Sequence, residues 1–157
     1  MHKRVSFLLS IIICLLLSSC WHMNAPTEDK PEVQPITIQN FSKYPSNIEG
    51  CACYFANNEK FLLAQQYIFV ANYDSTAYMT INNKQIKFKL ESTGREPNTF
   101  GDHDHKEVYN SGNFKIEVDI KYKKSTDSEV WIDEGTITIT RKGGQMLVTK
   151  FYGECGC

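Results

Sequence analysis

Residues 114–123 have the sequence Phe-Lys-Ile-Glu-Val-Asp-Ile-Lys-Tyr-Lys, in which apolar and charged residues alternate without interruption. Successive side chains of an extended chain point to opposite faces, so this stretch has one apolar face and one charged face. The pattern predicts a β-strand that packs one face on a core. Residues 85–90 alternate in the same way, and residues 136–140 alternate threonine with isoleucine. Residues 67–73 are mainly apolar on both faces, which is typical of a more buried strand.

The turn at residues 82–84, Asn-Asn-Lys, predicts how two of these strands pair. A two-residue loop at Asn83-Lys84 places Ile81 opposite Ile86, and asparagine tolerates the positive φ that a type I′ turn requires. A loop one residue earlier would place Ile81 opposite Lys84, an apolar residue against a charged one. We therefore expect the loop at Asn83-Lys84.

A second turn, Lys142-Gly143-Gly144, suits a three-residue hairpin loop and pairs Ile139 with Leu147. Sequential strands joined by short turns predict a single antiparallel all-β meander of about seven or eight strands, either a small barrel or a sandwich. Residues 56–66 could hold one short helix, and a mixed α+β domain with one packed helix is the alternative.

The N-terminus has the order of an export signal. A basic start, with Lys3 and Arg4, is followed by thirteen residues, Val5–Leu17, that are apolar except for Ser6 and Ser10. A transmembrane helix needs about 20 apolar residues, so the run is short for an anchor helix.

The segment Leu17-Ser18-Ser19-Cys20 ends this run and resembles the lipobox of bacterial lipoproteins. The resemblance implies cleavage before Cys20, a diacylglyceryl thioether on its sulfur and an acyl chain, such as palmitate, on the new N-terminus. Several acyl chains give stable membrane anchoring. In the sorting rule of this class, aspartate after the cysteine retains a lipoprotein in the inner membrane. Trp21 stands there, so the resemblance favours the outer membrane, with the domain facing the periplasm or the cell surface.

Three segments follow from these signals. Residues 1–19 are the expected signal peptide, residues 20–40 a lipidated N-terminus and flexible tether, and residues 41–157 a β domain. The tether carries Pro26, Pro31 and Pro35 and few apolar residues, which favours an extended, solvated chain. Without Lys3 and Arg4, the mature chain has 17 − 2 = 15 basic and 18 acidic residues, a balance of −3. This balance does not indicate a nucleic-acid partner.

Two Cys-x-Cys pairs, Cys51/Cys53 and Cys155/Cys157, lie at the start and the end of the expected domain. Disulfides are the first expectation in an exported chain. Alternatives are a four-thiolate zinc or Cu(I) site and a redox-active pair, although both more often use Cys-x-x-Cys. Residues i and i+2 of a strand share a face, so two facing segments form bridges more easily than either pair alone. Antiparallel pairing gives Cys51–Cys157 with Cys53–Cys155, parallel pairing gives Cys51–Cys155 with Cys53–Cys157, and the other strands favour the antiparallel set.

Asp102-His103-Asp104-His105 is the second group of candidate ligands. A His-x-His pair on a strand can bind a metal. The group lies within a polar stretch, residues 91–113, that contains Gly94, Pro97 and Gly101, so a solvated loop is favoured and no metal site is expected. The acidic pair Asp133-Glu134 is likewise interpreted as a solvent-facing turn or strand edge.

No nucleophile elbow, phosphate loop or dinucleotide fingerprint occurs, so an enzyme is not expected and no cofactor is implied. Three classes of function stay open. The first is a non-enzymatic, membrane-anchored envelope lipoprotein that binds an unidentified envelope protein or supports an assembly, and this class is favoured. The second is metal binding or sensing. The third is periplasmic inhibition of a hydrolase of the lysozyme type, which rests on fold-level analogy alone.

Overall fold

A computed structural model describes residues 34–43, 48, 50–73, 75–95 and 103–157. The expected signal peptide, Cys20, most of the expected tether and Asp102 lie outside these residues. No helix within the described ranges has the length and apolar character needed to cross a bilayer.

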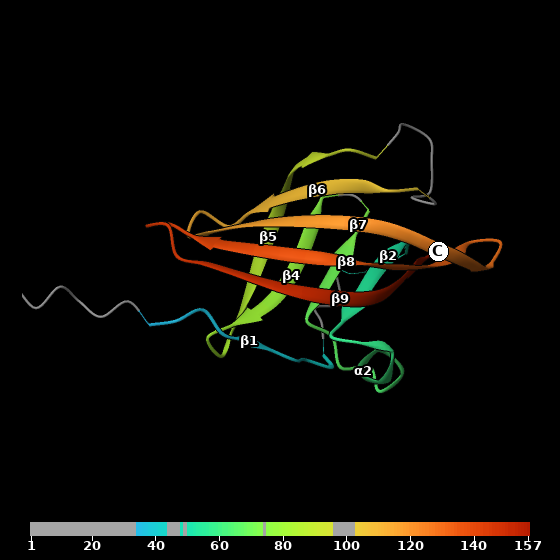
Figure 1. The fold of residues 1–157 in the computed structure, drawn as a ribbon, viewed down its shortest axis with the longest axis horizontal. Coiled ribbons are helices and arrows are strands. Elements are labelled where there is room, and N and C mark those ends of the chain that lie inside the picture. The colour runs from blue at the N-terminus through green and yellow to red at the C-terminus, as the bar shows by residue number, and fades with distance from the viewer. Residues whose placement is uncertain (1–33, 44–47, 49, 74, 96–102) are drawn as a thin grey trace, which may run out of the picture. The chain divides into compact units, whose positions relative to one another are not determined.

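The described residues form one nine-stranded antiparallel sheet and a short helix (Figure 1). The elements, in chain order, are β1 (Ile38–Gln39), β2 (Ala52–Ala56), α2 (Glu59–Leu63), β3 (Phe69–Asn72), β4 (Thr76–Ile81), β5 (Lys84–Thr93), β6 (His105–Asn110), β7 (Phe114–Asp127), β8 (Val130–Arg141) and β9 (Met146–Gly156).

Strands β2 to β9 close into an eight-stranded barrel. The sheet order is β1-β4-β3-β2-β9-β8-β7-β6-β5, and β4 also pairs with β5, which joins the two ends of the row. The short β1 is an additional strand on β4. The prediction of an all-β antiparallel domain is therefore confirmed. Of the two architectures that the sequence left open, the domain is a barrel and not a sandwich. Most strands that pair in the barrel are also consecutive in sequence. The exception is the pair of β9 and β2, the last and first strands of the barrel.

Alternation along the strands supplies the barrel core. In β7, Ile116, Val118 and Ile120 are fully buried, whereas Glu117 is exposed and Asp119 half-buried between them, as the period of two predicts. Phe55 and Phe151 stack inside with ring centroids 4.1 Å apart. An eight-stranded barrel has an interior that side chains can fill. The other large, fully buried side chains are Tyr109, Phe69, Phe88, Ile68, Met79, Ile81, Ile137, Ile139 and Val70.

The β4–β5 turn differs from the predicted register. Ile81 pairs with Lys84, so the loop is Asn82-Asn83 rather than Asn83-Lys84. Both asparagines have positive φ, 50° and 62°, as a type I′ turn requires at both central positions. The predicted register was wrong, because both registers place the same residues of each strand on the same face and the faces therefore do not distinguish them. Lys84 lies at the barrel rim, where its charged end reaches water.

The other hairpin, the helix and the domain start can also be compared with the sequence. Ile139 pairs with Leu147 across a Lys142-Gly143-Gly144 turn, as predicted. Helix α2 lies within residues 56–66 and begins after Asn58, whose side chain accepts a hydrogen bond from the Phe61 amide. Strand β1 lies inside the 20–40 segment expected to be tether. Ile38 of β1 and Ile36 just before the strand pack on the barrel core, so the folded domain begins before residue 41.

Candidate functional site

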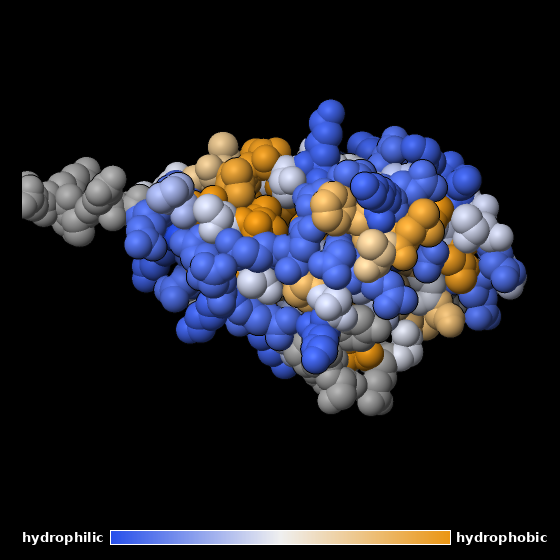
Figure 2. Space-filling view, turned by 90° about the horizontal axis from the view of Figure 1, so that it is seen from below, coloured by the Kyte–Doolittle hydropathy of each residue, from blue (hydrophilic) through white to orange (hydrophobic). Residues whose placement is uncertain are grey.

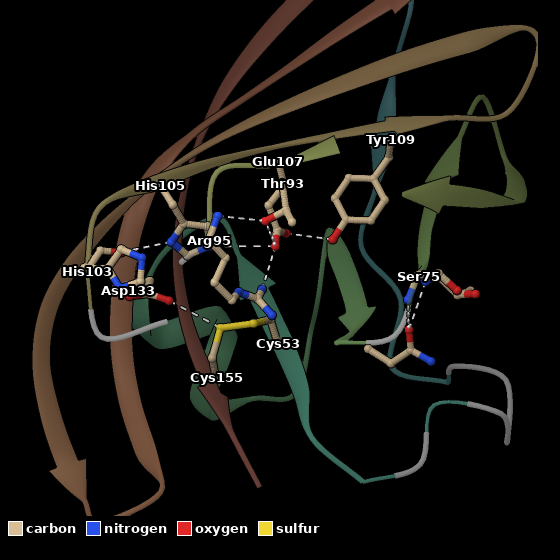
Figure 3. Close-up of polar contacts among 12 residues, drawn as sticks. Cys53, Ser75, Thr93, Arg95, His103, His105, Glu107, Tyr109, Asp133 and Cys155 are labelled. Atoms are coloured by element: carbon tan, nitrogen blue, oxygen red, sulfur yellow. Dashed lines mark hydrogen bonds and ion pairs between the residues drawn. A yellow bond between two sulfur atoms is a disulfide. The ribbon is translucent and has the colours of Figure 1, made fainter. Parts of the chain in front are cut away.

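The inward-facing positions become polar at one end of the barrel. His105 and Glu107 of β6 and Asp133 of β8 are the buried charged residues among those described, with exposed fractions of 8%, 3% and 1%. In Figure 3 these side chains point toward one another, with Arg95 between them and the Cys53–Cys155 disulfide beside Asp133. We call His105, Glu107, Asp133 and Arg95 the barrel-end cluster.

Strand alternation places the cluster inside the barrel. His105, Glu107 and Tyr109 are two residues apart and share a face of β6. Glu107 pairs with Val118 of β7, a core residue, which fixes that face as the inner one. Asp133 has the same parity on β8 as the buried Ile137, so it also points inward.

Glu107 holds the centre of the cluster. Its Oε1 atom lies 2.5 Å from the Arg95 Nη2 atom, and its Oε2 atom accepts a 2.7 Å hydrogen bond from the Tyr109 hydroxyl. The Thr93 hydroxyl lies 3.5 Å from Oε1, and the His105 Nε2 atom lies 3.7 Å from it. A buried carboxylate needs such partners, since an unpaired buried charge costs several kcal/mol, about 3–5 when one partner of a pair is removed.

The pKa values of Glu107 and His105 reflect their mutual contact. Burial favours the neutral form of Glu107, but His105, Arg95 and Tyr109 outweigh it and hold the pKa below its usual value. Burial would also lower the His105 pKa, but Glu107 and the His103 carbonyl outweigh it and raise that pKa. The His105 Nδ1 atom lies 2.8 Å from the His103 carbonyl oxygen, which can only accept, so Nδ1 carries a proton.

Asp133 is the acid of the cluster without an ion-pair partner among the described residues. Burial raises its pKa from 3.8 to about 7, and the positive charge of His105 offsets part of that rise. The Asp133 Oδ2 atom lies 3.3 Å from the Cys155 sulfur. A disulfide sulfur has no hydrogen, so this contact is a hydrogen bond only when the carboxyl is protonated and donates.

We expect Asp133→Asn to remove a pH-dependent cost of folding. Between pH 3.8 and about 7 the folded state keeps a proton that the unfolded chain releases, so stability falls as the pH rises through this window. Asparagine is neutral throughout. Urea unfolding should show the variant gaining stability over the wild type between pH 4 and 7, by on the order of a few kcal/mol. Asp104→Asn, at an exposed carboxylate that is paired with Lys121, should show no such gain. Parallel pH profiles for wild type and Asp133→Asn would contradict the assignment.

The four domain cysteines form two bridges between β2 and β9. Cys51 joins Cys157, and Cys53 joins Cys155. This is the antiparallel set that the sequence favoured, and it follows from β2 and β9 being antiparallel neighbours with Cys53 opposite Cys155. Cys53 and Cys155 are buried in the core, whereas Cys157 is exposed. The Cys53–Cys155 bridge is therefore the inner one, buried in the core, and the Cys51–Cys157 bridge is the outer one, nearer to solvent.

The Asp102–His105 segment differs from the solvated loop that was expected. Asp104 is exposed and pairs with Lys121, and His103 is half-buried. His105, however, begins β6 and is buried, so the loop interpretation is wrong there. The interpretation of Asp133 as solvent-facing is wrong as well, whereas Glu134 is exposed. Among the described residues, no three His, Cys, Asp or Glu side chains gather as a metal ion would require.

Sequence reasoning missed Arg95, Glu107 and Tyr109 as site residues. Residues 105–110, His-Lys-Glu-Val-Tyr-Asn, do alternate, but the inner face carries His105 and Glu107, which resemble a surface pattern. The usable signal is a glutamate flanked at i±2 by histidine and tyrosine in a stretch that alternates. A polar inner face is a departure from the ordinary pattern of a barrel strand.

The fold and the cluster define this protein's class: a small antiparallel β-barrel with two bridges and a charged group enclosed at one end. A scan against protein-family models and searches of curated proteins and of solved structures found no match for the chain. The function must therefore be argued from the site and the sequence signals rather than from kinship.

Proposed function

We propose that the chain is an exported lipoprotein of the bacterial envelope, anchored by acyl chains on Cys20. Its barrel serves as a non-enzymatic domain that binds an envelope protein or supports an assembly, with the outer membrane as the favoured location. The observation that carries the proposal is the pair of bridges between β2 and β9, across separations of 106 and 102 residues. Such bridges persist in oxidising compartments such as the periplasm, and the lipobox at Cys20 supplies an anchor there.

The outer surface supports a binding or structural role for the barrel. The most exposed large apolar residues among those described are Leu63 on α2 and Met146 and Val148 on β9. On the face drawn in Figure 2, hydrophobic residues lie in separate areas between hydrophilic ones. A protein partner that covers Leu63, Met146 or Val148 would remove apolar area from water, which favours association.

We expect Cys20→Ser to abolish lipid labelling and to leave unprocessed precursor, because the thioether and the cleavage both require the cysteine sulfur. Metabolic labelling with palmitate, followed by membrane fractionation, measures both effects. Cys157→Ser is the matched control, since it also replaces a cysteine by serine but leaves the lipobox intact. Normal processing of the Cys20 variant together with an unlabelled wild type would rule out the anchor.

The role of the barrel needs a separate test. The wild-type chain and a triple variant, Leu63→Ser with Met146→Ser and Val148→Ser, are used as baits in envelope extract. We expect an envelope protein to be retained by the wild type and lost with the variant. Binding and inhibition of lysozyme would instead favour the inhibitor class, and an identical set of proteins on both baits would contradict the proposed surface.

A further inference from the structure

Five buried polar atoms at one end of the barrel have no hydrogen-bond partner among the described residues. They are the Tyr73 hydroxyl oxygen, Arg95 Nε, His105 Nε2, Trp131 Nε1 and Asp133 Oδ1. Asp119 Oδ1 is the sixth atom of this kind, and it lies beside Lys121 on the outer surface. Most buried polar groups in native proteins are hydrogen-bonded, so a concentration of unpaired ones points to a molecule that binds there.

Three of the five side chains lie in successive layers. The Arg95 guanidinium lies over the Tyr73 ring at 4.5 Å from its centroid, and the Tyr73 and Trp131 rings stack with centroids 6.1 Å apart and an interplanar angle of 11°. These contacts use the faces of the rings, and the Tyr73 hydroxyl and the Trp131 N–H lie at the ring edges. The Trp131 N–H is near enough to Asp133 to lower the pKa of that carboxyl, but it forms no full hydrogen bond with it. The remaining two groups, on His105 and Asp133, belong to the barrel-end cluster.

Four of the five unpaired groups can donate a hydrogen bond, and the fifth, Asp133 Oδ1, is a carboxyl oxygen. Arg95 Nε and Trp131 Nε1 can only donate, and the Tyr73 hydroxyl keeps its proton because burial raises its pKa far above 10. His105 donates from Nε2 when it is charged, since its Nδ1 proton is used by the His103 carbonyl. A molecule that satisfies these groups must therefore present several acceptor atoms in a small space.

Charge balance favours a single negative charge. Arg95 is a cation and Glu107 an anion, and His105 is a second cation whenever it is protonated. Asp133 is neutral below about pH 7, so one positive charge is left without a counter-charge. A phosphate dianion would exceed that balance and would approach Glu107. A monoanion with two acceptor oxygens matches both the charge and the donors.

The size of the molecule is limited by the core. The interior beyond the cluster is filled by Phe55, Phe69, Phe151 and their neighbours. A long acyl chain or an aromatic acid therefore has no room along the barrel axis, whereas formate, or acetate with one further carbon atom, needs the least space of the carboxylates.

We propose that this end of the barrel binds a small monocarboxylate, of the size of formate or acetate, through the N–H groups of Arg95 and Trp131 and the hydroxyl of Tyr73. The carboxylate reaches the site from solvent beside Arg95. The Arg95 side chain is 16% exposed, whereas those of His105 and Glu107 are 2% and 4% exposed. The proposal does not depend on the lipid anchor or on a protein partner.

The test uses the full chain with Trp21→Phe, which leaves Trp131 as the only tryptophan. Sodium formate is titrated against sodium chloride at equal ionic strength, and Trp131 fluorescence and the melting temperature are recorded. We expect formate, and not chloride, to change the fluorescence saturably and to raise the melting temperature. Butyrate should bind more weakly than formate or acetate.

Tyr73→Phe is the decisive variant, because it keeps the ring stack and removes one hydroxyl. We expect it to weaken formate binding about tenfold, the value of one hydrogen bond to a charged group. Tyr152→Phe, which removes a hydroxyl from the outer face of β9, should leave binding unchanged. Arg95→Lys keeps the positive charge but removes Nε–H, and it should also weaken binding. Equal responses to formate and chloride, or wild-type affinity in Tyr73→Phe, would overturn the proposal and leave ordered water as the partner of these groups.

Discussion

Glu107→Ala should lower the free energy of unfolding by about 3–5 kcal/mol. The substitution removes the acceptor of Arg95 and of the Tyr109 hydroxyl, and it leaves His105 without the carboxylate beside its Nε2 atom. An uncompensated buried charge costs more than the pair itself contributes. Urea unfolding at neutral pH measures the change, with Glu107→Gln separating the loss of charge from the loss of shape.

Glu117→Ala is the matched control for this prediction. Glu117 is on β7, is exposed, and pairs with Lys115 at 2.7 Å on the outer face of the barrel. Exposed pairs contribute about 0–1 kcal/mol, so its removal should have little effect. The Glu107 pKa lies below its ordinary value of 4.5, so its contribution should be present above that pH and be lost as the pH falls further. Equal stabilities of the two alanine variants would show that Glu107 is not the centre of the cluster.

Removal of both bridges should have the second large effect. Replacing all four cysteines by alanine should lower the free energy of unfolding by about 2–5 kcal/mol, because each bridge closes a loop of more than 100 residues in the unfolded chain. Replacing only one pair should cost much less in loop entropy, since the other bridge still holds the same two strands together.

The three variants form a thermodynamic cycle. We expect the effect of the fourfold variant to exceed the sum of the two paired variants, because the bridges are redundant in closing the loop. The Cys53/Cys155 pair should cost more than the Cys51/Cys157 pair, since the inner cysteines are buried and their truncation leaves a cavity. Additive effects would mean that each bridge acts through local packing and not through the unfolded chain.

The strands were predictable where hydrophobic periodicity determines them. The alternation in residues 114–123 predicted β7 and its inner face, and the glycine-rich turn after Arg141 predicted the β8–β9 register. The β4–β5 register was predicted wrongly, because the two-residue loop lies one position earlier in the chain than expected. The alternation of side chains along a strand cannot distinguish two loops that keep the same face of each strand inside. The loop position is set instead by Asn82 and Asn83, which both adopt positive φ.

The pairing of the cysteines could be predicted from the sequence, whereas the barrel-end cluster could not. Cysteine spacing and strand parity were enough to favour Cys51–Cys157 with Cys53–Cys155, because geometry restricts the choices. The cluster could not be predicted, because His105, Glu107 and Asp133 are residue types that ordinarily lie on surfaces. Glu107 is paired in the barrel by Arg95, which follows β5 and contacts Glu107 on the neighbouring strand β6.

The position of β9 has a consequence for the order of events during synthesis. This strand comprises the last strand residues in the sequence, 146–156, yet it pairs with both β8 and β2. Until it has emerged, β2 and β8 each present an open edge, and open edges can pair with other chains. Contacts between segments more than 100 residues apart also make folding slow. A chain emerging from a ribosome therefore completes its barrel only after residues 146–156 are free to pair with β2 and β8.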